Sequence, residues 1–466
     1  MKTSAQEHGD RRSTHAEIPV DELRAQLSGE LIGPEDPAYE QARRVFFKGF
    51  DRTPLAVARV AGVEDVVRVV AAAREGGVEL AVRSGGHSRA GYGTSDGGLV
   101  IDLSALKAME IDADGGTVWV ETGITAGEYT AATSERGLVT GLGDAGSVGL
   151  GGITLAGGVG FLVRKYGLTI DDLIAAELVT ADGQARRVSE ESEPDLFRGI
   201  RGGESNFGVA TRFQLRLHEI SEIVGGMLIL PGTPEVITGF LEAAEAAPEE
   251  LSTIANVMLA PPMPFIPEEA QGQPIVIGTM AYVGPVDRGE SVVAPFRALA
   301  EPYADMVRPM RYPELYEGPE PEVRFASGAN FFADSLGPAG ADAILEQLPR
   351  STAMMKAVQL RVLGGALARV PNDATAFAHR DRGLFVNVAA AYTDAAEADT
   401  HAAWVDGLAD ALGRDGAGGY VGFMGDEDDA TIRSAYPGAT WDRLRQIKRR
   451  YDPDNLFRLN HNIPPA

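Results

Sequence analysis

The chain has 466 residues, 44% of them hydrophobic and 23% charged, which is typical of a globular protein long enough for two domains. Its formal net charge of −25 disfavours nucleic acids and anionic lipids as partners, because both would be repelled. The absence of cysteine excludes disulfides, thiolate metal sites, iron–sulfur clusters and cysteine nucleophiles.

The first part of the chain is predicted to fold as an α/β layer. Residues 1–17 are polar and lack the apolar core of a signal peptide, and we expect them to be disordered. The periodicity that follows predicts helices over residues 20–27 and 36–46, a strand over 55–60, a helix over 63–74 and a strand over 78–82. This strand–helix–strand order with short connections is typical of an α/β unit.

A second domain is expected from about residue 220. Before it, strands over 173–180 and 185–189 flank the turn signal Ala-Asp-Gly, and another strand covers 211–217. Beyond it, the predicted elements are strands over 226–230, 275–283 and 384–391, helices over 234–246, 286–299 and 394–411, and a proline-rich loop over 260–274. We therefore place a second α/β domain at about 220–412, followed by a charged C-terminal segment.

The longest apolar run covers residues 138–163 and is rich in glycine. Its length would suit a membrane span, but the recurring glycines and Asp144 favour a closely packed flavin or nucleotide loop instead. Residues 141–146, GLGDAG, match the Gly-x-Gly-x-x-Gly pattern. As a dinucleotide fingerprint the match is weak, because more glycine follows it rather than the helix that the motif requires.

The first glycine-rich loop of the chain, here named the histidine loop, carries a histidine. Residues 83–93 read RSGGHSRAGYG and lie between two predicted buried strands. Glycine lets a backbone turn tightly and approach a ligand closely, so the loop alone suggests a phosphate cradle. A phosphate cradle does not explain His87 in its middle.

Four segments, in this order and spacing, resemble one protein family. They are RSGGHS (83–88), GSVGLGGITLAGGVGFLVRKYGLTID (146–171), DLFRGIRGGESNFGVATRF (195–213) and YDPDNLFRLNHNI (451–463). They are similar to the vanillyl-alcohol-oxidase-type flavoproteins, and more closely to the berberine-bridge-enzyme-like FAD oxidases. The resemblance runs from about residue 40 to the end and is weaker between 220 and 350.

This resemblance implies an α+β, two-domain, PCMH-type FAD-binding fold with a separate α/β substrate domain, in which helices cover an antiparallel sheet. The FAD-binding domain would comprise residues 1–219 together with the returning segment 413–466. The substrate domain would comprise residues 220–412.

The resemblance implies that His87 attaches the flavin. In this family the histidine of SGGHS is bonded covalently to the 8α-methyl group of the flavin, and a neutral imidazole nitrogen is a suitable nucleophile. The alternatives are an ordinary loop histidine, or a noncovalent FAD site with His87 packed on the ring. The cofactor-binding residues that the resemblance implies are Arg83, Ser84, Gly85, Gly86, His87, Ser88, Gly143, Ser147, Val148, Gly151, Gly152, Gly157, Gly160, Val209 and Asn455.

The second glycine loop, over residues 143–153, departs from the family in two places. Many relatives attach the flavin a second time through a cysteine, but Ala145 stands at that position, so we expect a single attachment. Ile153 stands where a histidine often follows the double glycine. Val148 occupies the position of a small gate residue above the reactive carbon of the flavin, where valine goes with ready oxygen access; the alternative is simple packing between glycines.

Tyr420 is the candidate catalytic base. It opens a stretch that matches Tyr-x-Asn-Tyr on a family strand, although Gly422 and Phe423 have replaced the last two residues. Because a tyrosine has a pKa of about 10, Tyr420 must be activated by a nearby positive charge or act by hydrogen bonding. The alternative is a core tyrosine on a strand.

Asn387 is the third catalytic candidate, beside Tyr420 and Val148. It shares one face of a predicted strand with Phe385 and Ala389, and relatives often carry glutamine there. A polar side chain in such a strand needs a partner, so Asn387 either contacts substrate or makes a structural hydrogen bond.

The resemblance implies an oxidase that transfers hydride from an alcohol, sugar or amine-type small molecule to FAD and passes the electrons to oxygen, giving hydrogen peroxide. The alternatives are a noncovalent FAD dehydrogenase with another acceptor, and a flavin-binding protein without turnover. We expect a cytoplasmic protein without membrane or nucleic-acid partners. We also expect no metal site, since the 7 histidines show no ligand spacing. The oligomeric state stays open.

Overall fold

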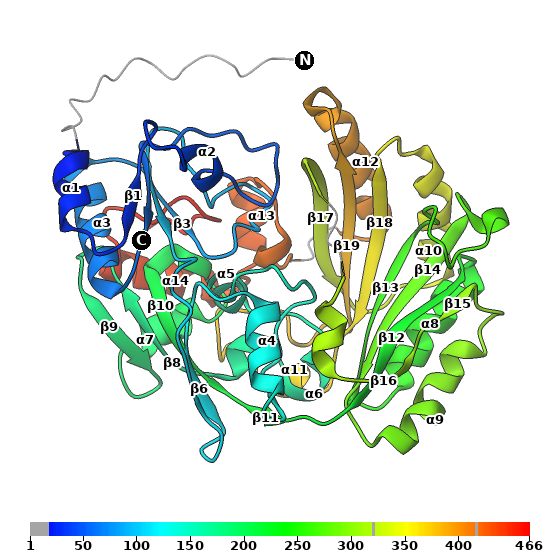
Figure 1. Cartoon of the computed structure of the whole chain (residues 1–466). Coiled ribbons are helices and arrows are strands. Elements are labelled where there is room, and N and C mark those ends of the chain that lie inside the picture. Colours follow the sequence, from blue (N-terminus) through cyan, green and yellow to red (C-terminus); the bar gives the residue numbers. More distant parts are fainter. Residues whose placement is uncertain (1–17, 319–321, 415–417) are drawn as a thin grey trace.

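The computed structural model describes residues 18–318, 322–414 and 418–466, so the predicted disorder of residues 1–17 falls outside the described part. Figure 1 shows the strands gathered on two sides of the molecule, with smaller sheets on the left and one large sheet on the right. The candidate site lies where these two sides face each other.

The first sheet positions the histidine loop. Its strands, in spatial order, are β1 (Glu30–Ile32), β2 (Ala56–Arg59), β4 (Leu99–Asp102) and β3 (Leu80–Arg83). Strands β2 and β3 both run parallel to β4 between them, as the strand–helix–strand reading requires. Helix α3 (Val63–Gly76) covers this sheet and ends at Gly77, whose φ of 63° is the left-handed conformation that glycine adopts most readily.

The second sheet continues the left side and is antiparallel throughout. Its strands, in spatial order, are β5 (Met109–Asp112), β6 (Thr117–Glu121), β10 (Val209–Arg216), β8 (Leu173–Val179) and β9 (Ala185–Ser189). The predicted hairpin joins β8 to β9. The other elements of this side are α1 (Val20–Gln26), α2 (Tyr39–Ala42), α4 (Ala126–Ser134), β7 (Leu138–Val139), α5 (Leu150–Ala156), α6 (Val163–Tyr166), α7 (Pro194–Ile200), the 3₁₀ turns η1 (Thr169–Asp171) and η2 (Glu204–Phe207), and β11 (His218–Glu219).

The large sheet is also antiparallel, and helices cover its outer face (Figure 1). Its main strands, in spatial order, are β15 (Ala304–Asp305), β12 (Ile223–Pro231), β14 (Pro274–Tyr282), β13 (Leu251–Leu259), β18 (Met355–Val362), β19 (Leu384–Tyr392) and β17 (Phe325–Ala333), with β16 (Arg308–Met310) beside β12. The covering helices are α8 (Pro234–Ala246), α9 (Val286–Arg297), α10 (Pro338–Gln347) and α12 (Ala398–Ala411). This is the expected α+β fold with a helix-covered antiparallel sheet; the domain boundaries at 219 and 412 stay predictions.

Alternation along the strands gives the large sheet two different faces. On β18, Val358 and Leu360 point into the core beneath the helices, whereas Ala357 and Gln359 line a cavity on the other side. Successive side chains of a strand point to opposite faces, so one apolar face can pack while the other binds a ligand.

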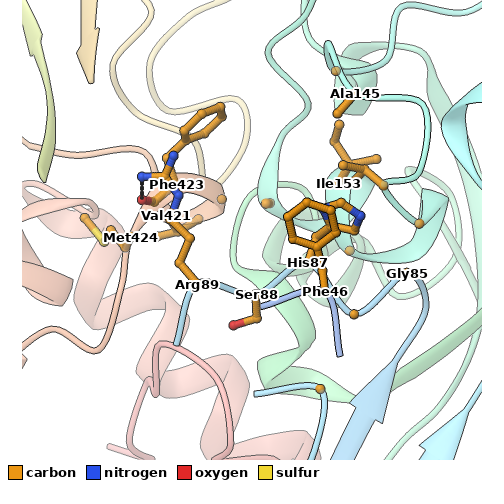
Figure 2. Close-up of a pocket in the computed structure, with 18 of the residues that line it drawn as sticks. Phe46, Gly85, His87, Ser88, Arg89, Ala145, Ile153, Val421, Phe423 and Met424 are labelled. Atoms are coloured by element: carbon orange, nitrogen blue, oxygen red, sulfur yellow. Dashed lines mark hydrogen bonds between the residues drawn. The ribbon is translucent and has the colours of Figure 1, made fainter. Parts of the chain in front are cut away.

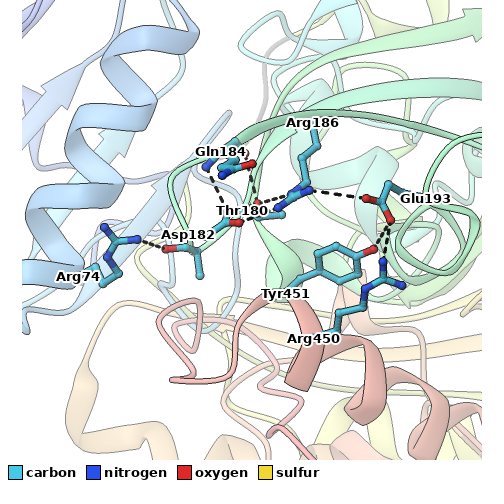
Figure 3. Close-up of polar contacts among 9 residues, drawn as sticks. Arg74, Thr180, Asp182, Gln184, Arg186, Glu193, Arg450 and Tyr451 are labelled. Atoms are coloured by element: carbon cyan, nitrogen blue, oxygen red, sulfur yellow. Dashed lines mark hydrogen bonds and ion pairs between the residues drawn. The ribbon is translucent and has the colours of Figure 1, made fainter.

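The C-terminal segment returns to the left side (Figure 1). It contains η7 (Val421–Phe423), α13 (Asp429–Ser434) and α14 (Ala439–Tyr451). Figure 3 shows how α14 is held: Arg450 and the hydroxyl of Tyr451 both contact the carboxylate of Glu193, which precedes α7. Nearby, Arg74 of α3 donates to the carbonyl oxygen of Ala181 in the β8–β9 turn.

Two local predictions were wrong. The helix expected over residues 36–46 is limited to α2, because the chain beyond it turns so that Phe47 packs against Val323 and Ala391. Tyr420 lies not on a strand but immediately before the 3₁₀ turn η7.

The long apolar run over 138–163 folds as β7, α5 and the start of α6. No helix in the described ranges combines the length and the apolar character needed to cross a membrane.

Candidate active site

A cavity of about 620 Å³ lies between the histidine loop, the second glycine loop and the uncovered face of the large sheet. The predicted site residues that line it are Arg83, Ser84, Gly85, Gly86, His87, Ser88, Gly143, Val148, Gly151, Gly152, Asn387 and Tyr420. The fold thus brings together residues that are up to several hundred positions apart in the chain.

His87 is held on two sides. Its ring stacks on that of Phe46, with centroids 4.0 Å apart, and its Nε2 lies 2.7 Å from the Oγ of Ser147 (Figure 2 shows the stacked pair). The loop that carries His87 leaves β3 and turns at Gly86, whose φ of 73° favours glycine. The imidazole therefore has a fixed orientation at the cavity wall.

The two glycine loops touch through their backbones. A Cβ added at Gly85 would lie 2.2 Å from the backbone nitrogen of Gly149, so no other residue fits at Gly85 without displacing the loops. The Oγ of Ser84 joins the loops by donating to the carbonyl oxygen of Thr122 at 2.6 Å and accepting from the N–H of Gly151 at 3.3 Å.

Arg83 stabilises the start of the histidine loop. It is buried, and its guanidinium pairs with Asp102 at 2.9 Å and donates to the carbonyl oxygens of Ala42 and Arg44. Ser88 accepts a hydrogen bond from the N–H of Tyr92. Both side chains thus stabilise the loop itself.

The second glycine loop presents Val148 and Gly152 to the cavity. The carbonyl oxygen of Val148 accepts from the N–H of Ala126 at 2.8 Å, which fixes the valine relative to α4. A Cβ added at Gly152 would meet no atom within 4 Å, so a side chain there would project into the cavity. The carbonyl oxygen of Gly143 accepts from the hydroxyl of Tyr316.

Five predicted cofactor-binding residues do not line the cavity. Ser147 contacts the ring of His87, which lines the cavity. Gly157 ends α5, and Gly160 allows close approach to the carbonyl oxygen of Leu142. Val209 is buried at the start of β10, and Asn455 forms a turn with a φ of 54°. Beyond that turn, Leu459, Asn460 and His461 line the cavity instead.

Tyr420 is fixed at both ends. Its N–H donates to the Oδ1 of Asn330 at 2.6 Å, and its hydroxyl accepts from the N–H of Gly158 at 2.9 Å. Burial raises the pKa of Tyr420 to about 12, although the N–H donors of Gly158 and Val159 and the charge of Arg361 act in the opposite direction. At neutral pH the side chain is therefore a neutral phenol.

Asn387 lines the cavity from β19, and its Oδ1 accepts a hydrogen bond from Nη1 of Arg89 at 3.2 Å. Its structural partner is thus a charged side chain of the histidine loop. Sequence analysis did not identify Arg89, although a cation two positions after His87 in a glycine loop is a usable signal.

A second arginine lies behind the cavity wall. Arg361 on β18 is only 2% exposed; it donates to Asp144 at 2.6 Å, to the Oε1 of Gln359 and to the carbonyl oxygen of Val159. Asp144, which sequence analysis noted only as a polar interruption, is therefore the counterion of a buried arginine.

A buried histidine completes the polar lining. The Nδ1 of His461 lies 2.9 Å from the carboxylate of Glu204, and its Nε2 lies 2.9 Å from the carbonyl oxygen of Gly425. Because both partners are acceptors, both ring nitrogens must carry hydrogen. Burial lowers the pKa of His461, but Glu204, the carbonyl oxygen of Gly425 and Glu427 together act against burial, and the net effect is to raise the pKa.

The cavity suits a dinucleotide such as FAD. Glycines bring the backbones of both loops to its surface, and Gly152 leaves space that a side chain would fill. Asn460 lines the cavity with a buried Oδ1 that accepts no hydrogen bond within the described ranges, as a site for hydroxyl-rich groups would provide.

Comparisons with known proteins agree with this geometry. Residues 54–189 match the family described as FAD binding domain, and residues 420–464 match berberine and berberine like. The chain is 29% identical to (R)-6-hydroxynicotine oxidase from Paenarthrobacter nicotinovorans over 457 residues, covering 94% of this chain and 97% of that protein.

Two solved structures share the fold. The structure of 6-hydroxy-D-nicotine oxidase from Arthrobacter nicotinovorans superposes with a TM-score of 0.83 at 27% identity, covering 94% of this chain and 98% of the other. BBE-like 1 from Physcomitrella patens superposes with a TM-score of 0.85 at 22% identity, covering 96% of this chain and 99% of the other. The chain therefore contains a segment that matches an FAD binding domain and a C-terminal segment that matches berberine-like proteins, and over nearly its whole length it is similar to FAD-linked oxidoreductases.

Proposed function

We propose that this protein is an oxidase whose FAD is attached through a single covalent bond to His87 and whose substrate is an alcohol, sugar or amine-type small molecule. The observation that carries the proposal is that one cavity is lined by His87, by both glycine loops and by the uncovered face of the large sheet. When bound, FAD would accept hydride from the substrate and pass the electrons to oxygen, which leaves as hydrogen peroxide.

His87 is the residue that would hold the cofactor covalently. Stacking on Phe46 and the contact with Ser147 restrict the imidazole to one orientation, and a fixed nucleophile needs little reorganisation to react. Arg83 and Ser84 keep the surrounding loop in place. Since the chain has no cysteine and carries Ala145 in the second loop, a second attachment, through a cysteine thioether, is impossible.

On the substrate side, Tyr420, Asn387 and Val148 have different roles. The neutral hydroxyl of Tyr420 accepts from Gly158 and keeps its own proton to donate, so it orients the reacting group rather than removing a proton as a phenolate. Asn387 fixes Arg89. Val148 governs access of oxygen, because its backbone is anchored while its side chain faces the cavity.

Cofactor binding and substrate binding are assigned to the two sides of the fold. Residues 1–219 and 413–466 would bind the cofactor, and residues 220–412 would bind the substrate. The proposal draws support from His461 and Asn460, which lie on the returning segment and line the same cavity as the histidine loop.

The function is tested by separating the two half-reactions. The purified protein is mixed without oxygen with a panel of alcohols, sugars and amines, and flavin bleaching is followed by absorbance; air is then admitted. We expect at least one compound to bleach the flavin, and air to restore the colour within minutes with release of peroxide. Bleaching without recovery in air would indicate a dehydrogenase with another acceptor. No bleaching by any compound would indicate a flavin-binding protein without turnover.

A further inference from the structure

Arg89 extends from the histidine loop to the opposite wall of the cavity. Figure 2 shows its side chain running away from His87 toward Phe423. Its Nη1 donates to the Oδ1 of Asn387 at 3.2 Å and to the carbonyl oxygen of Phe423 at 3.4 Å, and its Cζ lies 5.1 Å from the centroid of the Phe423 ring. The guanidinium is thus fixed over the substrate-side sheet.

One edge of this guanidinium has no protein acceptor. Both hydrogen bonds that Arg89 donates use Nη1, and within the described ranges neither Nε nor Nη2 donates to a protein acceptor. These two nitrogens form the side-on edge of arginine, whose parallel N–H groups match the two oxygens of a carboxylate. The hydrogen bonds through Nη1 therefore orient the arginine and leave its two-donor edge for a ligand.

The sheet makes room for the guanidinium. A Cβ added at Gly328 on β17 would lie 2.5 Å from Nη1 of Arg89, so any larger residue there would displace the arginine. Gly328 pairs with Ala389 on β19, which also lines the cavity with a small side chain. Small residues on two neighbouring strands thus accommodate a large cation.

Arg361 lies beside the same phenylalanine ring as Arg89, but its donors are used for contacts within the protein. Its Cζ lies 5.2 Å from the same Phe423 ring, but its donors are taken by Asp144, Gln359 and the carbonyl oxygen of Val159. Arg361 has a carboxylate partner at 2.6 Å, whereas no carboxylate within the described ranges lies within 4.0 Å of Arg89.

The charges around the cavity leave Arg89 uncompensated. Each other ionised group of the lining is paired: Arg83 with Asp102, Asp144 with Arg361, and Glu204 with His461. Burial lowers the pKa of Arg89 to about 10, so the guanidinium still carries its charge at neutral pH. A positive charge without a carboxylate partner in a cavity attracts an anion, even in a chain with a net charge of −25.

We propose that Arg89 binds a carboxylate of the substrate side-on through Nε and Nη2. The alcohol, sugar or amine that is oxidised would therefore also carry a carboxylate group before it reacts. This inference rests on the proposed function, since it concerns the substrate of that reaction. The same chemistry would suit a phosphate of the dinucleotide. The guanidinium contacts β17 and β19 of the large sheet, on the wall opposite His87, and this position favours the substrate.

The test measures binding separately from turnover. The FAD-loaded full-length protein is titrated with benzoate and with its neutral isostere benzamide, and binding is followed by the change in flavin absorbance. The titration is repeated with Arg89→Gln, with Arg89→Lys, and with Arg382→Gln as a control that removes an exposed arginine elsewhere. FAD content is measured for each protein.

We expect wild type and Arg382→Gln to bind benzoate about 10- to 100-fold more tightly than benzamide, the range for charge-assisted hydrogen bonds. Arg89→Gln should lose this preference with its FAD content unchanged. Arg89→Lys should keep only part of it, because a lysine offers no two-donor edge. Should Arg89→Gln fail to fold, the partial loss in Arg89→Lys tests the proposal.

Three results would overturn the proposal: no preference in wild type, an unchanged preference in both Arg89 variants, or loss of FAD from Arg89→Gln, which would assign the anion to the cofactor. The proposed function fails independently, if no compound bleaches the flavin while the preference for benzoate is present.

Discussion

At the scale of single residues, the cavity surroundings determine the protonation of Tyr420 and His461. Tyr420 is a neutral phenol because burial raises its pKa to about 12, and His461 carries both ring protons because it faces two acceptors. Arg361 is neutralised by Asp144, whereas Arg89 is not. Under the proposed function, the site therefore orients and attracts a substrate more than it deprotonates it.

Tyr420→Phe should slow flavin reduction by about 10- to 100-fold, as the loss of one oriented hydrogen bond implies. The slowing should be the same from about pH 6 to 9, since a phenol with a pKa of about 12 does not titrate there. Stopped-flow reduction at several pH values measures both. A loss of about 10²–10⁴-fold that grows with pH would instead identify Tyr420 as a general base.

Val148→Leu should slow reoxidation by oxygen and leave reduction by substrate nearly unchanged. The added methylene projects into the cavity, because the backbone of Val148 is anchored to Ala126. Val148→Ala is the matched control and should reoxidise at least as fast as wild type. Normal reoxidation of Val148→Leu in stopped-flow experiments would show that oxygen takes another path.

Glu204→Gln should remove a pH-dependent part of the stability. The folded-state pKa of His461 is raised above 6.5, so its contribution is complete below pH 6.5 and is lost as the pH rises through the folded-state value. Tyr92 packs edge-on against its ring, and the Glu427 carboxylate adds to the effect of Glu204. Urea unfolding should show wild type more stable than the variant by about 1–3 kcal/mol at pH 6, with a smaller difference at higher pH.

The exposed Glu346→Gln variant serves as the control for this measurement. It removes the surface pair with Arg350 and should change stability by no more than about 1 kcal/mol at any pH. A difference between wild type and Glu204→Gln that grows with pH would contradict a protonated His461.

At the scale of elements, the returning segment is anchored by a buried ion pair. Lys448 of α14 and Asp452 are both 0% exposed and lie 2.7 Å apart. Lys448 also donates to the carbonyl oxygens of Asn206 and Phe457, and the Asp452 carboxylate accepts from the N–H groups of Leu456 and Phe457. Burial lowers the pKa of Lys448, and Asp452 acts against that shift. This cluster fixes the turn that leads to the cavity.

Lys448→Met should destabilise the protein by about 3–5 kcal/mol, because it leaves the Asp452 carboxylate buried without its cation. Arg443→Met, on the same helix, removes only an exposed pair with Asp195 and should cost no more than about 1 kcal/mol. Chemical unfolding of both variants measures the difference. Equal effects would show that the buried pair does not anchor the segment.

Elements whose signal is local were predictable from the sequence. Helix α8 and strand β9 match their predicted bounds, because both have regular periodicity and clear turn or cap residues. Strands β13, β17 and β18 were not predicted, since each has one cavity face and its pattern mixes polar and small residues with apolar ones. The position of Tyr420 before a 3₁₀ turn follows from tertiary packing and had no local signal.

At the scale of the whole molecule, the fold brings three distant parts of the chain to one cavity. The histidine loop and the glycine-rich segment were recognisable from sequence because their motifs are local. The different roles of Arg89 and Arg361 were not recognisable from sequence. They depend on which of the two arginines pairs with a carboxylate from a distant part of the chain. Motifs thus indicated the cofactor, whereas the charge pattern that points to a substrate appears only in three dimensions.

The central claim is that His87 carries the flavin, and the mass of the denatured intact protein tests it most directly. We expect a wild-type chain heavier by one FAD and a His87→Ala chain at its unmodified mass. In that variant, FAD should still bind noncovalently between the glycine loops. An unmodified wild-type mass, or a His87→Ala chain that retains the added mass, would contradict the account.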